Sequence, residues 1–469
     1  MNNNNKALKS GVWYTAANFL VRSIGFITTP IFTRLLTQEE FGAYNNYTSW
    51  LSLITIFMTL NLEATLISAR FDFKDKFDDY ILSILALSSI SVGIWFVVLN
   101  VFSDVACSLF GLSRIYVNAM LVYLLFLPAI NLFQARERYY FEYKKTVITS
   151  LLLAFGTALL SVLLVMNMEN KLSGRIIGSV IPTVIIGFFL YVFFLKMGKK
   201  INITYWKYAL PICLPYIPHL LAGTLLNSTD RIMINRWCGD EATALYSVAY
   251  SCGLIVTLLL NSLNSAFAPW LGEKLAENRK NEIKKVSKIY ISIFVFMAIG
   301  IMLVSPEILL VLGGESYMEA IYVLAPVSMG CICQFLYTLL VNIEQFKKKT
   351  VGMAIASTIA ALVNLGLNFI FIPRFGYLAA AYTTLVGYLC LLVLHMYLVH
   401  RLKLDDVYSY RFIMASVLIG LCAMVLITFS YSNTLMRYIA IGIYIIFTLM
   451  IISKYKNQLK TIIIKRKKV

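Results

Sequence analysis

The chain has 469 residues, of which 59% are hydrophobic and 14% are charged, and its mean hydropathy is +0.77. Soluble domains average about 45–50% apolar and about 25% charged residues, so this composition excludes an ordinary soluble protein and indicates one that lies in lipid. The net charge of +18 does not indicate nucleic-acid binding, because Lys and Arg lie in short segments between apolar runs and in a basic tail, KRKKV. That distribution is typical of a cytoplasmic membrane surface.

Apolar runs long enough to cross a bilayer, roughly 20 residues each, follow one another along the chain. They lie at about 12–36, 41–66, 79–103, 114–135, 147–168, 172–196, 208–234, 242–267, 287–312, 318–341, 351–372, 377–400, 411–430 and 435–454. The first run is too long for the apolar part of a signal peptide and has no small-residue cleavage site after it, so we interpret it as an uncleaved span. None of the runs alternates strictly, which favours helices over barrel strands. The predicted fold class is an all-α polytopic membrane protein with about 14 transmembrane helices.

The distribution of Lys and Arg between successive loops predicts the orientation. With the N-terminus inside, the large majority fall on the cytoplasmic side, and few fall outside. The outer ones are Arg34, Arg114, Lys171, Arg175, Arg236, Arg374 and Arg437. We therefore expect both termini in the cytoplasm and the chain in a bacterial cytoplasmic (inner) membrane.

Several classes of chemistry lack their motifs. The eight cysteines lie mostly inside apolar runs without paired CxxC motifs, which indicates packing cysteines and predicts no metal or cofactor. No G-x-x-x-x-G-K-[ST] sequence occurs, and no loop is long enough for a catalytic domain. The chain is expected not to be an enzyme.

The chain repeats itself. A shift of 202 residues places Arg34, Glu39 and Tyr44 on Arg236, Glu241 and Tyr246, and Gly174 on Gly376; a shift of 204 places KKTV at 144–147 on KKTV at 348–351. Six spans per copy is an even number, so the copies run in the same direction and are related by a pseudo-two-fold axis along the membrane normal. We predict an N-lobe at 1–200, a C-lobe at 201–405 and a final segment at 406–469 that holds two further spans and the basic tail.

Three segments carry a resemblance to a known family: ITTPIFTRLLTQEEFGAYN at 27–45, DRIMINRWCGDEATALYSVAY at 230–250 and IPRFGYLAAAYTTLVGY at 372–388. They resemble polysaccharide flippases, the O-antigen and capsule repeat-unit transporters of the multidrug/oligosaccharidyl-lipid/polysaccharide exporter superfamily. The resemblance implies translocation of an undecaprenyl-diphosphate-linked oligosaccharide from the cytoplasmic to the outer leaflet. It does not specify the sugar.

Charged residues inside spans are the first candidates for the substrate cavity, because each costs at least about 2.5–3.5 kcal/mol to insert. Arg22 lies near the middle of the first run, and a guanidinium suits phosphate oxygens; a structural pair with Glu63 is the alternative. Asp230 and Arg231 are about 100° apart on a helix, so they are expected to contact different neighbours. One could close the lobes together, or both could be shallow residues near the interface.

Two further groups are candidates. Arg136, Arg138, Lys144 and Lys145 form a basic, aromatic-flanked cluster that could capture the headgroup at the cytoplasmic leaflet, or could simply follow the positive-inside rule. Pro211, Pro215 and Pro218 fall within eight residues and predict a bent or broken helix, which is either a hinge or a static kink.

The expected mechanism is alternating access between two six-helix lobes. The expected partners are the lipid-linked oligosaccharide, the bilayer, Na⁺ or H⁺ as a coupling ion with Glu63, Asp230 or His219 as its site, and a polysaccharide polymerase. Three alternatives stay open: a cation-coupled multidrug exporter of the same superfamily, a polytopic polysaccharide polymerase, and a lipid II flippase.

Overall fold

The computed structural model describes residues 3–140 and 142–466, and within these ranges it is helical with no strand. The helices are α1 (Asn3–Leu35), α2 (Gln38–Met58), η1 (Leu62–Thr65), α3 (Leu66–Asp72), η2 (Lys74–Lys76), α4 (Phe77–Val101), α5 (Ser103–Phe110), α6 (Arg114–Tyr139), α7 (Tyr143–Asn167), α8 (Lys171–Met197), α9 (Ile203–Cys213), η3 (Leu214–Tyr216), α10 (Ile217–Ala276), α11 (Lys280–Gly313), η4 (Glu315–Ala320), α12 (Ile321–Phe346), α13 (Thr350–Phe375), α14 (Tyr377–Arg401), α15 (Tyr410–Ser430) and α16 (Thr434–Arg466). This confirms the all-α prediction.

The number of membrane-crossing helices is less firmly defined than the fold class. The predicted runs fall largely on helical residues. Among the residues that could be searched, ten helices are long and apolar enough to span a membrane, or eleven if α2 and the bent segment after it form one span. The figure of about 14 stays a prediction.

Contacts between residues divide the chain into two compact units. The first comprises residues 1–251, 312–316 and 350–387, and the second comprises residues 252–311, 317–349 and 388–469. The predicted six-helix lobes are a different division and stay a prediction.

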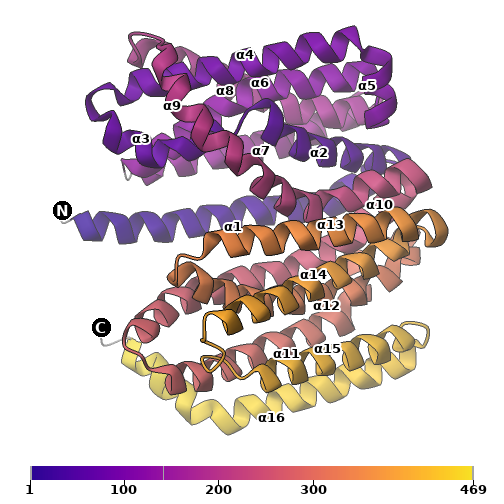
Figure 1. The fold of residues 1–469 in the computed structure, drawn as a ribbon. Helices are drawn as coiled ribbons and strands as arrows, with labels where there is room; N and C mark the ends of the chain where they lie inside the picture. The colour runs from indigo at the N-terminus through magenta and orange to yellow at the C-terminus, as the bar shows by residue number, and fades with distance from the viewer. Residues whose placement is uncertain (1–2, 141, 467–469) are drawn as a thin grey trace. The chain divides into compact units, whose positions relative to one another are not determined.

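The first unit is built on close packing among α4, α6, α7 and α8, of which α4, α6 and α8 lie side by side in Figure 1. The motif GRIIGS explains the contact between α7 and α8. A Cβ on Gly174 would lie 2.9 Å from the carbonyl carbon of Leu164, and one on Gly178 would collide with Ser161. Glycine is required there because the two backbones approach so closely.

The second unit has α12 near its centre, with 83% of the most apolar part of that helix buried. Phe335 of α12 stacks on Phe294 of α11 with ring centroids 4.1 Å apart. The last two helices, side by side in Figure 1, pack on α11. Tyr431 donates to the carbonyl of Met302 at 2.9 Å, and Tyr444 donates to the carbonyl of Phe296 at 3.0 Å. The two C-terminal helices are therefore part of this unit's core.

Two turns in the helical structure lie at positions that the shift of 202 residues relates. α10 runs from Ile217 to Ala276 but has one non-helical residue, Gly239, with φ +86°, which separates the two runs predicted around it. A shift of 202 residues places Gly239 on Thr37. Thr37 caps α2 reciprocally with Glu40, which makes a capping box. Both halves thus turn at the same position, by different local chemistry.

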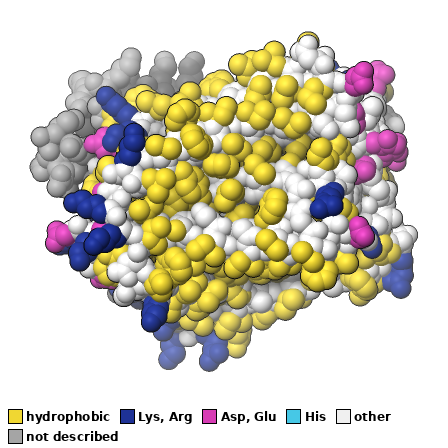
Figure 2. Space-filling model, turned by 90° about the horizontal axis from the view of Figure 1, so that it is seen from above, with side chains coloured by type: hydrophobic (Ala, Val, Ile, Leu, Met, Phe, Trp, Pro, Cys, Tyr) yellow, Lys and Arg dark blue, Asp and Glu magenta, His cyan; other side chains and the backbone are white. Residues whose placement is uncertain are grey.

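Large apolar side chains lie on the surface in a way that suits lipid and not water. Phe189 of α8 is 66% exposed and Phe429 of α15 is 70% exposed. Figure 2 shows one face that is mostly hydrophobic, with the charged side chains gathered toward its edges.

Candidate functional site

A buried carboxylate lies in the half of the chain that begins with α10. Asp230 is 2% exposed, and its side chain accepts three hydrogen bonds. Tyr246 and Thr384 donate to Oδ2 at 2.8 and 2.6 Å, and the amide of Asn368 donates to Oδ1 at 2.6 Å. These donors come from α10, α13 and α14, so one carboxylate ties three helices together.

A second layer orients these donors. Thr383 donates to the amide oxygen of Asn368, and Asn364 donates to Thr384 at 3.4 Å and accepts from Asn368 at 3.3 Å. No basic side chain of the described residues forms an ion pair with Asp230. Three hydrogen bonds therefore stabilise the buried charge. The carboxylate oxygens of Asp230, the hydroxyl oxygens of the neighbouring Tyr246 and Thr384, and the amide oxygens of the asparagines are also the ligand types that hard cations prefer.

Arg231 contacts a different neighbourhood, as adjacent positions on a helix require. Its Nε donates to Ser247 at 3.2 Å, and its guanidinium lies 4.9 Å from the ring centroid of Tyr250. The hydrogen bonds described for Asp230 join α10, α13 and α14.

A second charge inside the bundle, in the first half, was not among the predicted cavity residues. Arg175 was counted among the basic residues of the outer side, within the predicted run 172–196, and it is a half-buried residue in the second turn of α8. Its guanidinium carbon lies 3.8 Å from the ring centroid of Phe32 and 4.2 Å from that of Tyr44. Nη1 donates to Ser161 at 2.7 Å, and Nε is buried with no hydrogen-bond partner. The only sequence signal for it was its match to the GRIIGS motif.

Arg175 lines a cavity of about 590 Å³ inside the first unit. Its walls come from α1, α2, α6, α7 and α8 and include Tyr44, Tyr47, Tyr123, Gln134, Ser150, Thr157, Arg175, Ser179 and Thr183. Aromatic rings and hydroxyl or amide groups thus meet in one chamber, and no Asp or Glu is among the described residues that line it. Cavities of 300–1,000 Å³ are the usual size for small-molecule sites.

Glu63 lies beside a break in the second predicted span. Leu60 and Asn61 have φ of +59° and +46°, and the helix axes on either side differ by 48°. Glu63 is half-buried and accepts a hydrogen bond from Asn131 at 3.2 Å. Arg22 lies in α1, and its side chain is outside those that the structure describes.

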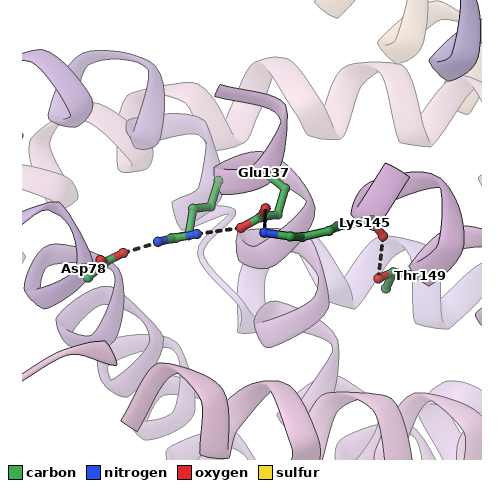
Figure 3. Close-up of polar contacts among 5 residues, drawn as sticks. Asp78, Glu137, Lys145 and Thr149 are labelled. Carbon is green, nitrogen blue, oxygen red and sulfur yellow. Dashed lines mark hydrogen bonds and ion pairs between the residues drawn. The ribbon is translucent and has the colours of Figure 1, made fainter. Parts of the chain in front are cut away.

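The predicted headgroup-capture cluster separates into two kinds of residue (Figure 3). Arg136 is 9% exposed and bonded to Asp78 at 2.8 Å and to Glu137 at 2.5 Å. Lys145 reaches the other oxygen of Glu137 at 3.1 Å. Arg136 is therefore held in a buried ion-pair network, whereas Arg138 and Lys144 are exposed.

The three prolines fall around a break in helical structure. α9 contains Pro211 and ends at Cys213, η3 contains Pro215, and Pro218 is in the first turn of α10. Cys213 contacts the backbone oxygen of Asn61 with its sulfur at 3.6 Å. The interruption before α10 thus lies against the interruption after α2.

The predicted outer ends of the two halves are in contact. A Cβ on Gly42 would lie 2.5 Å from the carbonyl carbon of Asp240, so the start of α2 presses on the turn at Gly239. Arg236 donates to the carbonyl of Ser108 at 3.0 Å. These contacts join the matched turns, and a role of Asp230 or Arg231 in closing the lobes stays a prediction.

The second unit holds a polar pair that the sequence analysis did not single out. The side chains of His395 and Glu344 are each 1% exposed, with His395 Nδ1 2.8 Å from Glu344 Oε1. Tyr337 stacks on the imidazole with centroids 5.6 Å apart. Sequence gave no signal for it, because α12 and α14 meet only in three dimensions.

Known proteins share this sequence and this fold. The family model described as "Polysaccharide biosynthesis protein" matches residues 7–275, more than half of the chain, and the MatE family model matches residues 215–370. The capsular polysaccharide biosynthesis protein CapF of Staphylococcus aureus is 24% identical over 408 residues, covering 82% of this chain and 97% of its own. The "Lsg locus putative protein 1" of Haemophilus influenzae is 24% identical over 353 residues, covering 72% of this chain and 84% of its own.

Among solved structures, the lipid II flippase MurJ in an inward closed conformation superposes with a TM-score of 0.70 at 14% identity. The match covers 96% of this chain and 100% of that one. At this identity the likeness shows the fold. Together with the length of the family match, it shows that the chain belongs to the polysaccharide biosynthesis protein family, with the fold of the MurJ and multidrug exporter transporters.

Proposed function

We propose that this protein is a flippase for undecaprenyl-diphosphate-linked oligosaccharide repeat units, which it moves from the cytoplasmic to the outer leaflet for cell-surface polysaccharide (O-antigen, capsule or exopolysaccharide) synthesis. The observation that carries the proposal is the chamber of about 590 Å³, in which Arg175 and several hydroxyl and amide side chains lie among apolar ones, inside an otherwise apolar bundle of this family. A hydrophobic drug does not need such a lining, whereas a glycan needs hydrogen-bond partners inside the membrane. The prenyl tail stays in lipid.

Transport proceeds by alternating access between the predicted six-helix lobes. The contacts of Gly42 with Asp240 and of Arg236 with Ser108 close the predicted outer end and must break for release. The interrupted helices around Asn61 and Pro215 supply bending points. Arg22 and the exposed Arg138, Lys144 and Lys145 meet the diphosphate before and during entry.

Membrane potential contributes to direction. Moving one charge across the membrane changes the free energy by about 2.3 kcal/mol per 100 mV, so a diphosphate of about two charges that leaves a negative interior gains roughly 4–5 kcal/mol. The remaining part of the cycle couples to Na⁺ or H⁺ at Asp230. In support, that carboxylate is 2% exposed and is held by the hydroxyls of Tyr246 and Thr384 and the amide nitrogen of Asn368.

One observation favours a second candidate, a cation-coupled multidrug exporter. The MatE family model matches residues 215–370, the segment that contains Asp230 and Asn368. The arginine in the polar chamber argues for the glycan, because a cationic drug would be repelled there.

The deciding experiment is a leaflet-resolved analysis of undecaprenyl-linked oligosaccharides in cells depleted of this protein. We expect complete repeat units to accumulate on the cytoplasmic side while surface polymer disappears. A normal lipid-linked pool with altered drug sensitivity would establish the exporter instead, and repeat units accumulating outside would indicate a polymerase, the enzyme otherwise expected to act after this step. Accumulation of lipid II would identify a peptidoglycan precursor as the cargo.

A further inference from the structure

The chamber of the first unit has a directional arrangement of chemical groups. Along α7 its lining residues are Ser150, Leu153, Ala154, Thr157 and Ala158. These positions fall on one helix face and extend about 12 Å at 1.5 Å per residue. The amide of Gln134 donates to Ser150 at 3.2 Å, toward the C-terminal end of α6 and the N-terminal end of α7, whereas Arg175 lies in the second turn of α8, which follows the C-terminal end of α7.

The wall formed by α8 repeats a polar residue every fourth position. Arg175, Ser179 and Thr183 all line the chamber, and a spacing of four places them in one row along the helix. This row faces the three tyrosines Tyr44, Tyr47 and Tyr123. An elongated chamber with hydroxyls on one wall and aromatic rings on another presents both polar and apolar surfaces, as a pyranose ring does.

Two polar groups at this chamber lack partners. The hydroxyl of Tyr47 is buried without a hydrogen bond, in a residue that is 0% exposed, and Nε of Arg175 is likewise unpaired. Both of these atoms are closed to solvent, but Arg175 as a whole is half-buried and lines the cavity. The accessible part of its side chain is therefore the cationic group that a ligand in the chamber can reach.

The charge balance identifies the ligand's charged group. Arg175 has aromatic and hydroxyl neighbours, and none of the described carboxylates pairs with it. One guanidinium can neutralise one carboxylate with two parallel hydrogen bonds. A diphosphate of about two charges would leave one buried charge uncompensated by the described lining.

We propose that this chamber binds one acidic monosaccharide of the glycan, of the uronic acid type, with its carboxylate on Arg175 and its ring against the tyrosines. The inference rests on the proposed function and specifies it further: the repeat unit is anionic, and the first half of the protein selects it by charge.

The test compares methyl β-D-glucuronide with methyl β-D-glucoside, two ligands that differ only at C6. Each is titrated against the full-length protein in lipid nanodiscs, and inorganic diphosphate is titrated as a third ligand to test for a headgroup site. We expect the glucuronide to bind at least about tenfold more tightly than the glucoside, because a hydrogen bond to a charged group contributes about 1.5–3 kcal/mol. Arg175→Gln should abolish that preference, and the matched control Arg114→Gln, which changes an exposed arginine near the same predicted face, should retain it.

Tyr44→Phe separates binding from folding. Tyr44 is half-buried and lines the chamber, and the substitution keeps the ring that lies under Arg175, so the melting temperature should not fall, while affinity for both glycosides should fall severalfold. Equal binding of the two glycosides by the unaltered protein would overturn the proposal. So would tighter, Arg175-dependent binding of diphosphate, which would make the chamber a headgroup site. Neither result touches flipping itself, which the leaflet analysis of depleted cells tests separately.

Discussion

Tyr44 and Tyr246, which the internal duplication relates, contact buried charges of opposite sign. The ring of Tyr44 lies under the guanidinium of Arg175, 4.2 Å from centroid to carbon. The hydroxyl of Tyr246 donates to the carboxylate of Asp230 at 2.8 Å. A tyrosine can do either, because its face attracts cations and its hydroxyl donates to anions. The related tyrosines thus contact a cationic side chain in the first half and a carboxylate in the second, as an anion-binding and a cation-binding site, which we propose above, would require.

Replacing the buried carboxylate tests the second of these sites. Asp230→Ala should lower the free energy of unfolding by about 2–4 kcal/mol, because it leaves the donors on Tyr246, Asn368 and Thr384 unpaired. Asp230→Asn keeps the shape and removes the charge, so it should fold nearly as well and yet lose Na⁺- or pH-dependent transport.

The measurement for Asp230→Asn is flipping of a fluorescent lipid-linked oligosaccharide in proteoliposomes, with and without a cation gradient. Equal gradient dependence in the substituted and unaltered proteins would remove Asp230 from ion coupling. Asn264→Asp serves as the control for a change of charge elsewhere, because Asn264 is a half-buried amide that hydrogen-bonds to Asn342 and not to Asp230.

The network in Figure 3 predicts unequal effects for neighbouring arginines. Arg136→Ala should destabilise the protein by about 2–3 kcal/mol, because it leaves Glu137, which is 1% exposed, with the half-exposed Lys145 as its remaining cationic partner. Arg138→Ala changes an exposed residue two positions away and should leave the melting temperature unchanged. Thermal unfolding in detergent checks both, and equal melting temperatures for the two variants would contradict the network's structural role.

Gly42 is predicted to limit how tightly the matched turns can close. A side chain there meets the backbone of Asp240, so Gly42→Leu should force the start of α2 away from the turn at Gly239. Labelling of the neighbouring Cys238 by a water-soluble maleimide, located by mass spectrometry, should become severalfold faster. Gly93→Leu, where no atom lies within 4 Å of a Cβ, is the control, and unchanged labelling in both would show that this contact does not govern access.

The His395 and Glu344 pair is predicted to stabilise the second unit without taking part in transport. Both side chains are buried, so Glu344→Ala should cost about 2–3 kcal/mol by leaving the imidazole unpaired, while Glu344→Gln should cost less because its amide oxygen can still accept a hydrogen bond. Thermal unfolding measures both. A transport defect in the Gln variant at normal melting temperature would assign the pair a functional role instead.

Local sequence patterns were enough to predict most of the helices of this protein and the family to which it belongs. A span needs only a run of apolar residues, and the predicted runs fall largely on helical residues. The break around Pro215 was expected from a cluster of prolines, and the turn at Gly239 lies between two predicted runs. The family segments were visible because short motifs persist where helices turn and meet.

Partners in three dimensions were beyond the sequence. Asp230 was recognised as a buried charge, but its bonds to Asn368 and Thr384 join residues 138 and 154 positions apart, and no periodicity encodes such a contact. Arg136 looked like a free headgroup ligand because its two carboxylates are placed by packing of α4 against α6.

Arg175 shows the division most clearly. A count of charges assigned it to the outer side, near the start of an apolar run, and said nothing of what its side chain contacts. Close packing at Gly174 and Gly178 draws α8 against α7, and the arginine lies between Phe32 and Tyr44 at a chamber. The sequence by itself determined the family and the helical class, since these depend on short-range patterns. Only the tertiary structure decided which charges face a cavity and which are neutralised, because that depends on how distant helices pack.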